Sequence, residues 1–378
     1  MANVLARLAI AISLALASAN ATVAGQPAHV SAARVPAWTI PSDVAIRARL
    51  ADMVDRRHVA PGLVVTIVGP TGKRVIAYGR MGPEDARPVD GDTLFEIGSI
   101  TKLFTGLLLT DMVWRGEVAL DDPAERYAPP GMILPRYGER RITLADLATH
   151  TAGLPDFPPN LTGQGRLNPF AGYDQARLNA VLAEWRLSRA PGAGYAYSSV
   201  GVGLLGDLLA RRADTDYEVL LKNRILGPLG MGDTGVILDQ RLARRLSPGH
   251  TVSFAPAPVW DMPVLKGAAG MKSSANDIAK FLAAELGYKP SPLHGPMQAM
   301  LRTNRPADWW ADRQAIGWVV SKTVMGEIWQ HEGMTSGYRC YIAIDPNRRT
   351  GIVVMANAAT PVTLDDFGDS ILIGTVRP

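Results

Sequence analysis

The stretch Phe95-Glu96-Ile97-Gly98-Ser99-Ile100-Thr101-Lys102 holds a serine and a lysine in an S-x-x-K arrangement, and an apolar run over residues 103–113 follows it. The composition and length of that run predict a buried helix, and Gly116 is typical of a helix end. Residues three apart in a helix share one face, so Ser99 and Lys102 should be neighbours if the helix begins near Ser99. Alone the pair is a weak signal, because a capping serine beside a solvated lysine has the same spacing.

The apolar surroundings of Lys102 give this pair its possible chemistry. A lysine packed among apolar side chains loses hydration, which disfavours its charged form and lowers its pKa. The uncharged amine can then take the proton from a neighbouring hydroxyl and make Ser99 a nucleophile. Free backbone N–H groups at the helix N-terminus would stabilise a developing oxyanion.

Composition excludes several other classes of function. The chain has 378 residues, with 39 Lys and Arg against 35 Asp and Glu, so its formal net charge is +4. That charge is too small, and too evenly spread, to indicate a nucleic-acid partner. The six histidines and the single cysteine, Cys340, do not have zinc-ligand spacing, so no metal and no cofactor are expected. One cysteine also leaves no internal disulfide.

The N-terminus predicts export. Arg7 precedes an apolar run over residues 8–17, and small residues suited to cleavage follow at 17–21. The run is too short to span a bilayer and contains no cysteine for a lipid anchor. Residues 1–21 are therefore predicted to be a signal peptide, and the mature protein to be secreted or periplasmic without a stable membrane anchor.

Strand patterns lie at both ends of the chain and helical patterns lie between them. The N-terminal part predicts a helix over 41–57 and a hairpin of strands over 62–69 and 74–79. Four helices are expected in the middle, over 142–150, 174–188, 200–212 and 275–286. Four strands and a closing helix are expected near the C-terminus, over 315–320, 327–331, 338–344, 351–356 and 363–373.

This order predicts an α/β fold of the α+β kind. One antiparallel sheet would be built from both termini and flanked by helices, with a mostly helical lobe inserted. Residues 22–378 would form a single domain, in which 38–119 and 290–378 make the α/β lobe and 120–289 make the helical lobe. A cleft between two lobes is a usual place for a site.

Two further motifs could supply partners for Ser99. Tyr197 lies in the stretch Ala196-Tyr197-Ser198-Ser199-Val200-Gly201, just before an apolar helix. A phenol can act as a general acid or base if a nearby ammonium lowers its pKa. The stretch Trp329-Gln330-His331-Glu332-Gly333-Met334-Thr335-Ser336-Gly337 ends a predicted strand. Its glycines would let a substrate backbone lie against the strand edge.

Together these three motifs resemble the serine β-lactamase and penicillin-recognising hydrolase family, in its class C branch. The resemblance covers almost all of the mature chain. Its further segments are Gly116-Glu117-Val118-Ala119-Leu120-Asp121-Asp122-Pro123, Leu147-Ala148-Thr149-His150-Thr151-Ala152-Gly153-Leu154-Pro155, Pro191-Gly192, Leu226-Gly227-Pro228-Leu229-Gly230-Met231 and Gly351-Ile352-Val353-Val354-Met355-Ala356-Asn357.

The resemblance implies a role for each catalytic residue. Ser99 would be the acylated nucleophile, Lys102 its proton acceptor, and Tyr197 the second proton-transfer group. Tyr195 is a rival for that last role, because Tyr195-Ala196-Tyr197 offers two phenols. The oxyanion hole would consist of the backbone N–H groups of Ser99 and Met334.

The resemblance also implies a set of substrate-binding residues: Ser199, His331, Glu332, Gly333 and Thr335. His331 would hold a substrate carboxylate or tune Tyr197. Two positions depart from the family pattern. Ser199 replaces the usual asparagine and has a shorter reach for a substrate amide. Glu332 replaces a small or hydroxylic residue, and its carboxylate would repel a substrate carboxylate unless it points away.

The sequence therefore leads to an exported serine hydrolase that acts through an acyl-enzyme on β-lactams or D-Ala-containing cell-wall peptides. Its partner would be a small molecule or a peptidoglycan-derived substrate. Two alternatives stay open. One is a carboxylesterase for small acyl esters, which the departures at Ser199 and Glu332 favour. The other is a non-catalytic sensor that binds peptidoglycan fragments or penicillin.

Overall fold

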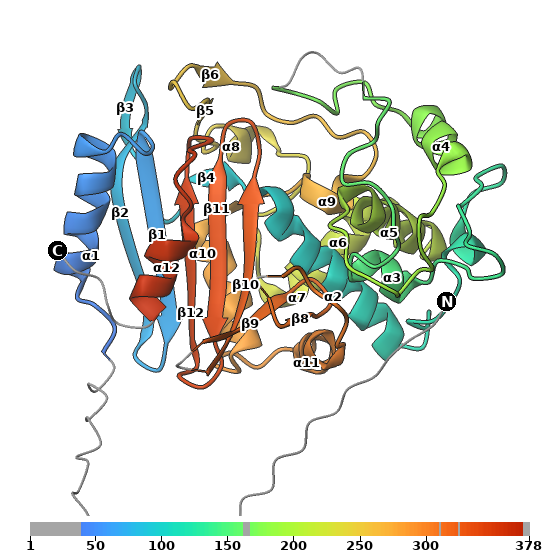
Figure 1. Cartoon of the computed structure of the whole chain (residues 1–378). Helices are drawn as coiled ribbons and strands as arrows, with labels where there is room; N and C mark the ends of the chain where they lie inside the picture. The colour runs from blue at the N-terminus through green and yellow to red at the C-terminus, as the bar shows by residue number, and fades with distance from the viewer. Residues whose placement is uncertain (1–38, 162–166, 310, 324–325, 373–378) are drawn as a thin grey trace, which may run out of the picture. The chain divides into compact units, whose positions relative to one another are not determined.

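Strands from both ends of the chain build one antiparallel sheet (Figure 1). The computed structural model describes residues 39–161, 167–309, 311–323 and 326–372. The strands of this sheet are β1 (Gly62–Gly69), β2 (Gly72–Gly82), β3 (Asp85–Pro88), β8 (Arg313–Gln314), β9 (Val319–Thr323), β10 (Gly326–Met334), β11 (Arg339–Asp345) and β12 (Thr350–Ala356). Their order is β3-β2-β1-β12-β11-β10-β9-β8, and every neighbouring pair is antiparallel.

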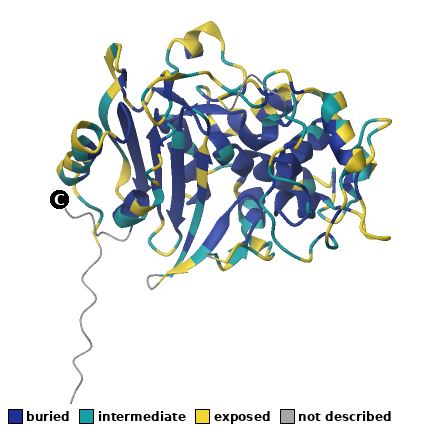
Figure 2. Ribbon diagram, turned by 45° about the horizontal axis from the view of Figure 1, so that its top comes forward, coloured by how far each residue is buried: buried dark blue, intermediate teal, exposed yellow. Residues whose placement is uncertain are grey.

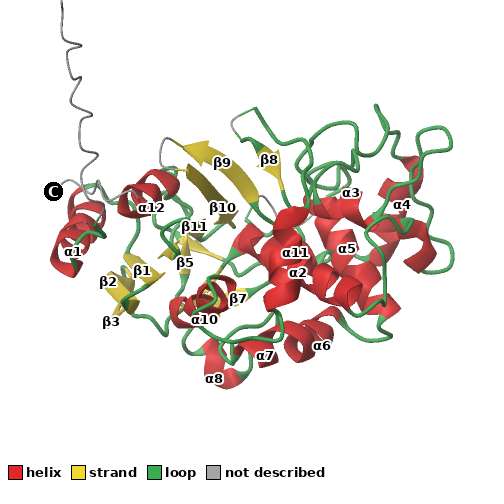
Figure 3. Cartoon of the chain, turned by 90° about the horizontal axis from the view of Figure 1, so that it is seen from below, coloured by secondary structure: helices red, strands yellow, loops and turns green. Residues whose placement is uncertain are grey.

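Helices cover both faces of the sheet (Figure 3). On one face lie α1 (Asp43–Ala51), with the π-helical turn Asp52–Arg56 after it, and α12 (Asp365–Leu372). On the other face, α10 (Ala275–Glu285) packs against β1 and β12. The sheet is therefore the middle layer of three, and its inner strands are buried (Figure 2).

Alternation along β1 explains why this strand is apolar throughout. Leu63 and Val65 join the core shared with α1 and α12, whereas Val64 and Val68 join the core on the α10 side. Successive side chains of a strand point to opposite faces, so a strand covered on both sides carries an unbroken apolar run.

The remaining helices gather around α2 (Thr101–Trp114), whose residues Thr101 to Met112 are all buried. Its neighbours include α5 (Ser199–Arg212), α9 (Lys266–Ala269) and α11 (His294–Arg302). The other helices are α3 (Leu144–Ala148), α4 (Gln175–Glu184), α6 (Tyr217–Leu221), α7 (Gly227–Leu229) and α8 (Gln240–Ala243). Two small ladders pair β4 (Leu94–Glu96) with β7 (Lys272–Ser274) and β5 (Gly249–His250) with β6 (Pro256–Ala257).

The predicted fold class is confirmed: an antiparallel sheet from both termini is flanked by helices, and helices fill the middle of the chain. The strand predicted over 315–320 is wrong as a continuous strand, because only Val319 and Val320 of this range lie in a strand, β9. Gly317 adopts φ +74°, and the Ala315 N–H donates to the Trp318 carbonyl at 2.9 Å, so the chain turns there between β8 and β9. Helix α11 was not predicted.

The signal peptide, the lobe boundaries and the membrane anchor were the remaining predictions about the chain. The signal peptide expected over 1–21 lies outside the described residues. The lobe boundaries at 119/120 and 289/290 stay predictions. Within the described part of the chain, no helix has both the length and the apolar character that a membrane span requires.

Candidate active site

Two glycines bring the end of β10 against the segment that carries Ser99. Gly98 adopts φ +50°, and a Cβ atom there would lie 2.5 Å from the Met334 nitrogen. A Cβ atom on Gly333 would lie 2.0 Å from the Ile97 carbonyl oxygen. Any side chain at either position would force the two backbones apart. Ser99 is therefore held at the edge of β10, next to the main chain of Met334.

Lys102 is buried beside Ser99. Its Nζ lies 2.9 Å from Ser99 Oγ, 3.0 Å from the Ala268 carbonyl oxygen and 3.3 Å from Ser199 Oγ. Only 1% of the residue is exposed, and this burial lowers the pKa of Lys102 to about 7. The expected desolvated lysine is thus present, and much of it is uncharged near neutral pH.

Tyr197 is the phenol that faces this pair. Lys102 Nζ lies 4.8 Å from the centre of the Tyr197 ring, and the Ser99 side chain is close enough to the phenol to favour its ionised form. Tyr195 instead meets the ring of His150 edge-on, at 5.7 Å between centroids. The expected lowering of the Tyr197 pKa by an ammonium is not found. Burial raises that pKa above its ordinary value, so the phenol keeps its proton.

His150 fixes the position of Tyr197. The two rings stack with centroids 4.4 Å apart. The Ser198 N–H donates to His150 Nδ1 at 3.1 Å, and the Ala196 N–H donates to the His150 carbonyl at 2.8 Å. The backbone on both sides of Tyr197 is therefore tied to one residue. His150 itself adopts φ +58°, an uncommon value for a residue with a side chain.

Ser199 connects Lys102 to a carboxylate that the sequence interpretation missed. The Ser199 hydroxyl donates to Asp156 Oδ1 at 2.8 Å, which leaves its oxygen free to accept from Lys102. The Ser199 N–H, at the start of α5, donates to the same carboxylate oxygen at 3.2 Å. A helix N-terminus favours a negative charge, so the start of α5 suits a carboxylate at this position. Its charge opposes part of the lowering of the Lys102 pKa.

The variant Asp156→Asn is expected to shift the acid limb of the pH profile of kcat/KM to lower pH. Removing the carboxylate removes the interaction that raises the pKa of Lys102, so the uncharged amine persists at lower pH. Asparagine can still accept the Ser199 hydrogen bond, which keeps the geometry comparable. The measurement is kcat/KM from pH 5 to 9 for both proteins. An acid limb that stays in place, or moves to higher pH, would show that Asp156 does not act on Lys102.

The edge of β10 beside Ser99 has no strand partner among the described residues. Pairing with β9 ends at Gln330, whereas pairing with β11 continues to Met334. The open part of the edge includes His331, whose ring approaches that of Tyr197 with centroids 6.4 Å apart. An extended substrate could lie along this edge, as the glycines of the motif predicted.

His331 differs from its expected role as a holder of carboxylates. Its Nδ1 lies 2.6 Å from the Glu332 carbonyl oxygen, so Nδ1 carries the proton and Nε2 presents a lone pair. Burial, with a contribution from Lys102, lowers the pKa of His331 to about 4, so the ring is neutral at pH 7. A neutral ring with an unprotonated Nε2 can accept a hydrogen bond but cannot hold a carboxylate.

The other expected substrate-binding residues divide into two groups. Ser199 and Glu332 line the pocket, and Glu332 forms an ion pair with Arg339 at 2.7 Å. Thr335 does not: it is 3% exposed, and its hydroxyl donates to Glu96 Oε2 at 2.9 Å. Gly333 packs against Ile97 and likewise does not line the pocket. Both residues therefore support the edge of β10 and do not contact a substrate in the pocket.

A pocket of about 410 Å³ lies over this arrangement, which is enough for a small acyl substrate. Its lining includes Ser99, Tyr195, Tyr197 and Met334, with Phe157 exposed beside them. Among the described residues, no group of three or more His, Cys, Asp or Glu side chains is placed to hold a metal ion. A hydroxyl beside a low-pKa amine and a neutral phenol, at an open strand edge, is an arrangement that could support nucleophilic catalysis.

Sequence reasoning missed His150 and Asp156. Both lie in or directly after the segment Leu147–Pro155, whose resemblance was noted without a role for either residue. Pro155 and Asp156 form a loop after α3 that docks on the start of α5, where Ser198 Oγ donates to the Pro155 carbonyl at 2.7 Å. The only signal in the sequence is a histidine and an acidic residue on either side of Thr151-Ala152-Gly153-Leu154-Pro155.

Comparison with known proteins places this site in a family. The Beta-lactamase family profile matches residues 45–371. The D-alanyl-D-alanine-carboxypeptidase/endopeptidase AmpH of Escherichia coli is 28% identical over 338 residues, which are 85% of this chain and 86% of that protein. A beta-lactamase of Pseudomonas fluorescens is 26% identical, over 79% of this chain and 89% of that protein.

Solved structures agree. A class C beta lactamase from Rhodobacter sphaeroides matches with a TM-score of 0.74 and 28% identity, over 87% of this chain and 98% of that chain. A beta-lactamase/D-alanine carboxypeptidase from Yersinia pestis, complexed with citrate, matches with a TM-score of 0.75 and 25% identity, over 89% and 100%. The chain belongs to the Beta-lactamase family.

Proposed function

We propose that this chain is a serine hydrolase that forms an acyl-enzyme on Ser99. The observation that carries the proposal is the 2.9 Å contact between the buried Lys102 amine and Ser99 Oγ, at the wall of a pocket that Ser99 lines. With its pKa near 7, Lys102 is available as a base around neutral pH. Tyr197, which keeps its proton and lies beside Lys102, is the second proton-transfer group.

The proposed reaction has two steps. Ser99 Oγ attacks the substrate carbonyl carbon while its proton passes to Lys102, and the proton then reaches the leaving group through Tyr197. The backbone N–H groups of Ser99 and Met334 hold the oxyanion, and each such donor is worth roughly 2.7–4 kcal/mol of barrier. Water then attacks the acyl carbon, its proton returns to Ser99 through Lys102, and the acid leaves.

Two substrate groups are candidates. The names of the relatives support β-lactams and D-alanyl-D-alanine peptides as one group. Esters of small acids are the second, and the Glu332 carboxylate at the pocket wall favours them, because penicillins and D-alanine termini both carry a carboxylate. The pairing of Glu332 with Arg339 reduces this repulsion and does not remove the group from the pocket. A purely binding role is less well supported, because Ser99, Lys102 and Tyr197 lie together as acylation requires.

The experiment compares a chromogenic cephalosporin, a D-alanyl-D-alanine peptide and p-nitrophenyl butyrate with the native protein and its Ser99→Ala variant. We expect hydrolysis that depends on Ser99, fastest for the ester. Rapid cephalosporin opening with no ester cleavage would reverse the order of the two substrate groups. A folded native protein that cleaves none of the three would leave only the binding role.

We also propose that the protein acts outside the cytoplasm. The charged, apolar and small-residue sequence of residues 1–21 supports export.

A further inference from the structure

Among the described residues, the pocket over Ser99 is lined by several acids and by no lysine or arginine. Four carboxylate side chains line it: Asp156, Glu332, Asp365 and Asp369. Lysine and arginine are absent from its described lining, and Lys102 lies behind Ser99 with much of it uncharged at neutral pH. A substrate that enters this pocket therefore meets a negative field.

Two of the four carboxylates already have a charged or structural partner. Asp156 accepts two hydrogen bonds from Ser199, and Glu332 is paired with Arg339. Asp365 and Asp369 come from the first two turns of α12, and both line the pocket. Neither carboxylate is paired with a lysine or arginine in the described lining, so their charge can act on a charged group of the substrate.

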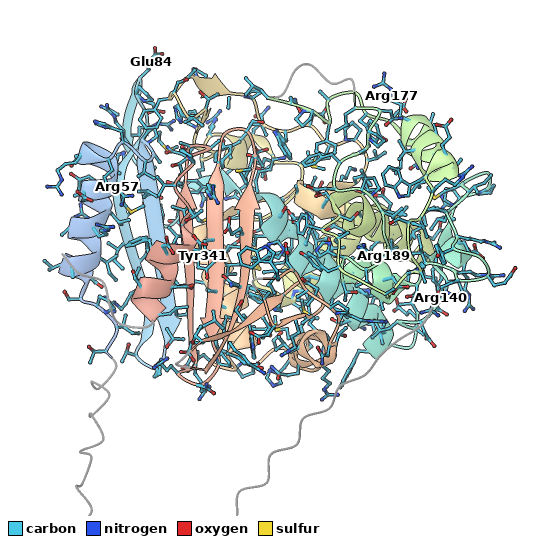
Figure 4. All side chains as sticks on the ribbon, in the orientation of Figure 1. Arg57, Glu84, Arg140, Arg177, Arg189 and Tyr341 are labelled. Atoms are coloured by element: carbon cyan, nitrogen blue, oxygen red, sulfur yellow. The ribbon has the colours of Figure 1, made fainter. Side chains whose placement is uncertain are left out.

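Strand β11 holds one of the two helical carboxylates, Asp369, at the pocket. Tyr341, labelled in Figure 4, donates its hydroxyl hydrogen to Asp369 Oδ1 at 2.6 Å and lies 2.8 Å from Gln330 Oε1. Burial raises the pKa of Asp369 to about 6, so the group is mostly ionised at pH 7.5. Asp365 Oδ1 is buried and has no hydrogen-bond partner among the described atoms. An unpaired acceptor of this kind favours a donor from a ligand.

The histidine at the open strand edge, His331, also disfavours a carboxylate on the substrate. It is 5% exposed, it lines the pocket, and its Nε2 has no partner among the described atoms. Because Nδ1 carries the proton, the unpartnered nitrogen is an acceptor. The one buried polar side chain of the open strand edge thus offers a lone pair where a carboxylate would need a donor.

Strand geometry shows which part of a substrate meets these groups. Side chains alternate along β10, so His331 faces Tyr197 while Gln330 and Glu332 face α12. Tyr197 is the proposed proton donor to the leaving group, so the leaving group would lie toward Tyr197 and His331, at the strand edge beside α12. The acyl group would then lie toward Ser199 and Asp156.

We propose that the pocket selects acyl substrates whose leaving group is uncharged or cationic, and discriminates against a carboxylate in that position, through Asp365 and Asp369. This selectivity rests on the proposed hydrolase function and defines its substrate class. Even when solvent screens the interaction, an opposite charge a few ångströms away raises the affinity for a substrate several-fold. A like charge at the same distance lowers the affinity by a similar factor.

The test uses three thioesters of butyric acid whose thiol leaving groups end in trimethylammonium, tert-butyl or carboxylate. The first two end groups have the same shape and differ in charge. Thiol release gives kcat/KM for each at pH 7.5. In the native protein the carboxylate thioester should be cleaved roughly tenfold more slowly than the tert-butyl one, as expected for a like charge at a partly screened site.

The thioesters also differ in the intrinsic reactivity of their thiol leaving groups. Comparing the same ratio of kcat/KM values between the native protein and its charge variants cancels that difference. The cationic-to-neutral ratio of kcat/KM should fall roughly five- to tenfold in Asp365→Asn/Asp369→Asn, and should fall in the native protein as salt is added. Asparagine at 369 can still accept from Tyr341. Asp366→Asn is the matched control: this exposed residue of α12 does not line the pocket, and its ratio should stay within about a factor of two of native.

Any of the following results would contradict the proposed selectivity. An unchanged ratio in the double variant, with Ser99-dependent cleavage of the tert-butyl thioester, contradicts the selectivity and leaves the hydrolase intact. A preference for the carboxylate thioester would mean that Arg339 leaves Glu332 to bind it. Cleavage of none of the three by the native protein contradicts both the selectivity and the hydrolase on which it rests. The salt dependence needs no variant, so a double variant that fails to fold does not prevent the test.

Discussion

Replacing Ser99 by alanine is expected to abolish both substrate cleavage and labelling by a fluorophosphonate probe, while the protein stays folded. Ser99 Oγ lies 2.9 Å from Lys102 Nζ and Ser99 lines the pocket, whereas the Ser199 hydroxyl, 3.3 Å from the same amine, donates to Asp156. The variant loses one hydrogen bond, worth about 1 kcal/mol, so its melting temperature should change by only a few degrees. The measurements are the hydrolysis rate, gel fluorescence after labelling, and a thermal melt.

The neighbouring serine provides the control. Ser198 caps α5 by accepting from the Gly201 N–H at 2.8 Å, and its own hydroxyl is bonded to the Pro155 carbonyl. Ser198→Ala should therefore lose stability and retain labelling. A Ser99→Ala protein that still labels, or that unfolds, would show that Ser99 is a structural residue and not the nucleophile.

Replacing Lys102 by methionine is expected to lower kcat by roughly 10²–10⁴-fold, the usual contribution of a general base. Stability should be unchanged or higher. The residue is 1% exposed and burial already disfavours its charge, so an apolar side chain of similar length avoids the cost of burying that charge. The measurements are single-turnover acylation and the midpoint of urea unfolding.

Lys73→Met makes the same chemical change at an exposed position on β2 and should leave activity at the native level. A Lys102→Met protein that acylates at the native rate would remove the base from the mechanism. A large loss of stability would indicate that Lys102 serves chiefly to satisfy the Ala268 carbonyl and Ser199.

The fold and part of the site could be predicted because their signals are local. The spacing of Ser99 and Lys102 fixes them on one turn, and the apolar run after them requires a buried helix, as α2 shows. The strands at both ends carry unbroken β-branched runs, which only a sheet covered on two faces explains. The choice of Tyr197 over Tyr195 as the group facing Lys102 agrees with the geometry.

The rest of the site depends on contacts between distant segments. Asp156 meets Ser199 across 43 residues, and no periodicity connects them. The tautomer of His331 is set by the carbonyl of its own neighbour, which the identity of the residue does not reveal. Thr335 was expected to face substrate, but it is turned inward by the buried carboxylate of Glu96. Each case was decided by a hydrogen bond that forms only after the sheet and helices assemble.

The proposed mechanism depends most directly on which atom of the protein becomes acylated. The deciding measurement is peptide mapping by mass spectrometry of the native protein after reaction with a fluorophosphonate, repeated from pH 5 to 9. The account predicts one adduct, on the peptide that contains Ser99, with a labelling rate that rises through about pH 7 as Lys102 loses its proton. A folded protein that carries its adduct on Ser198 or Ser199, or that carries none at any pH, would contradict it.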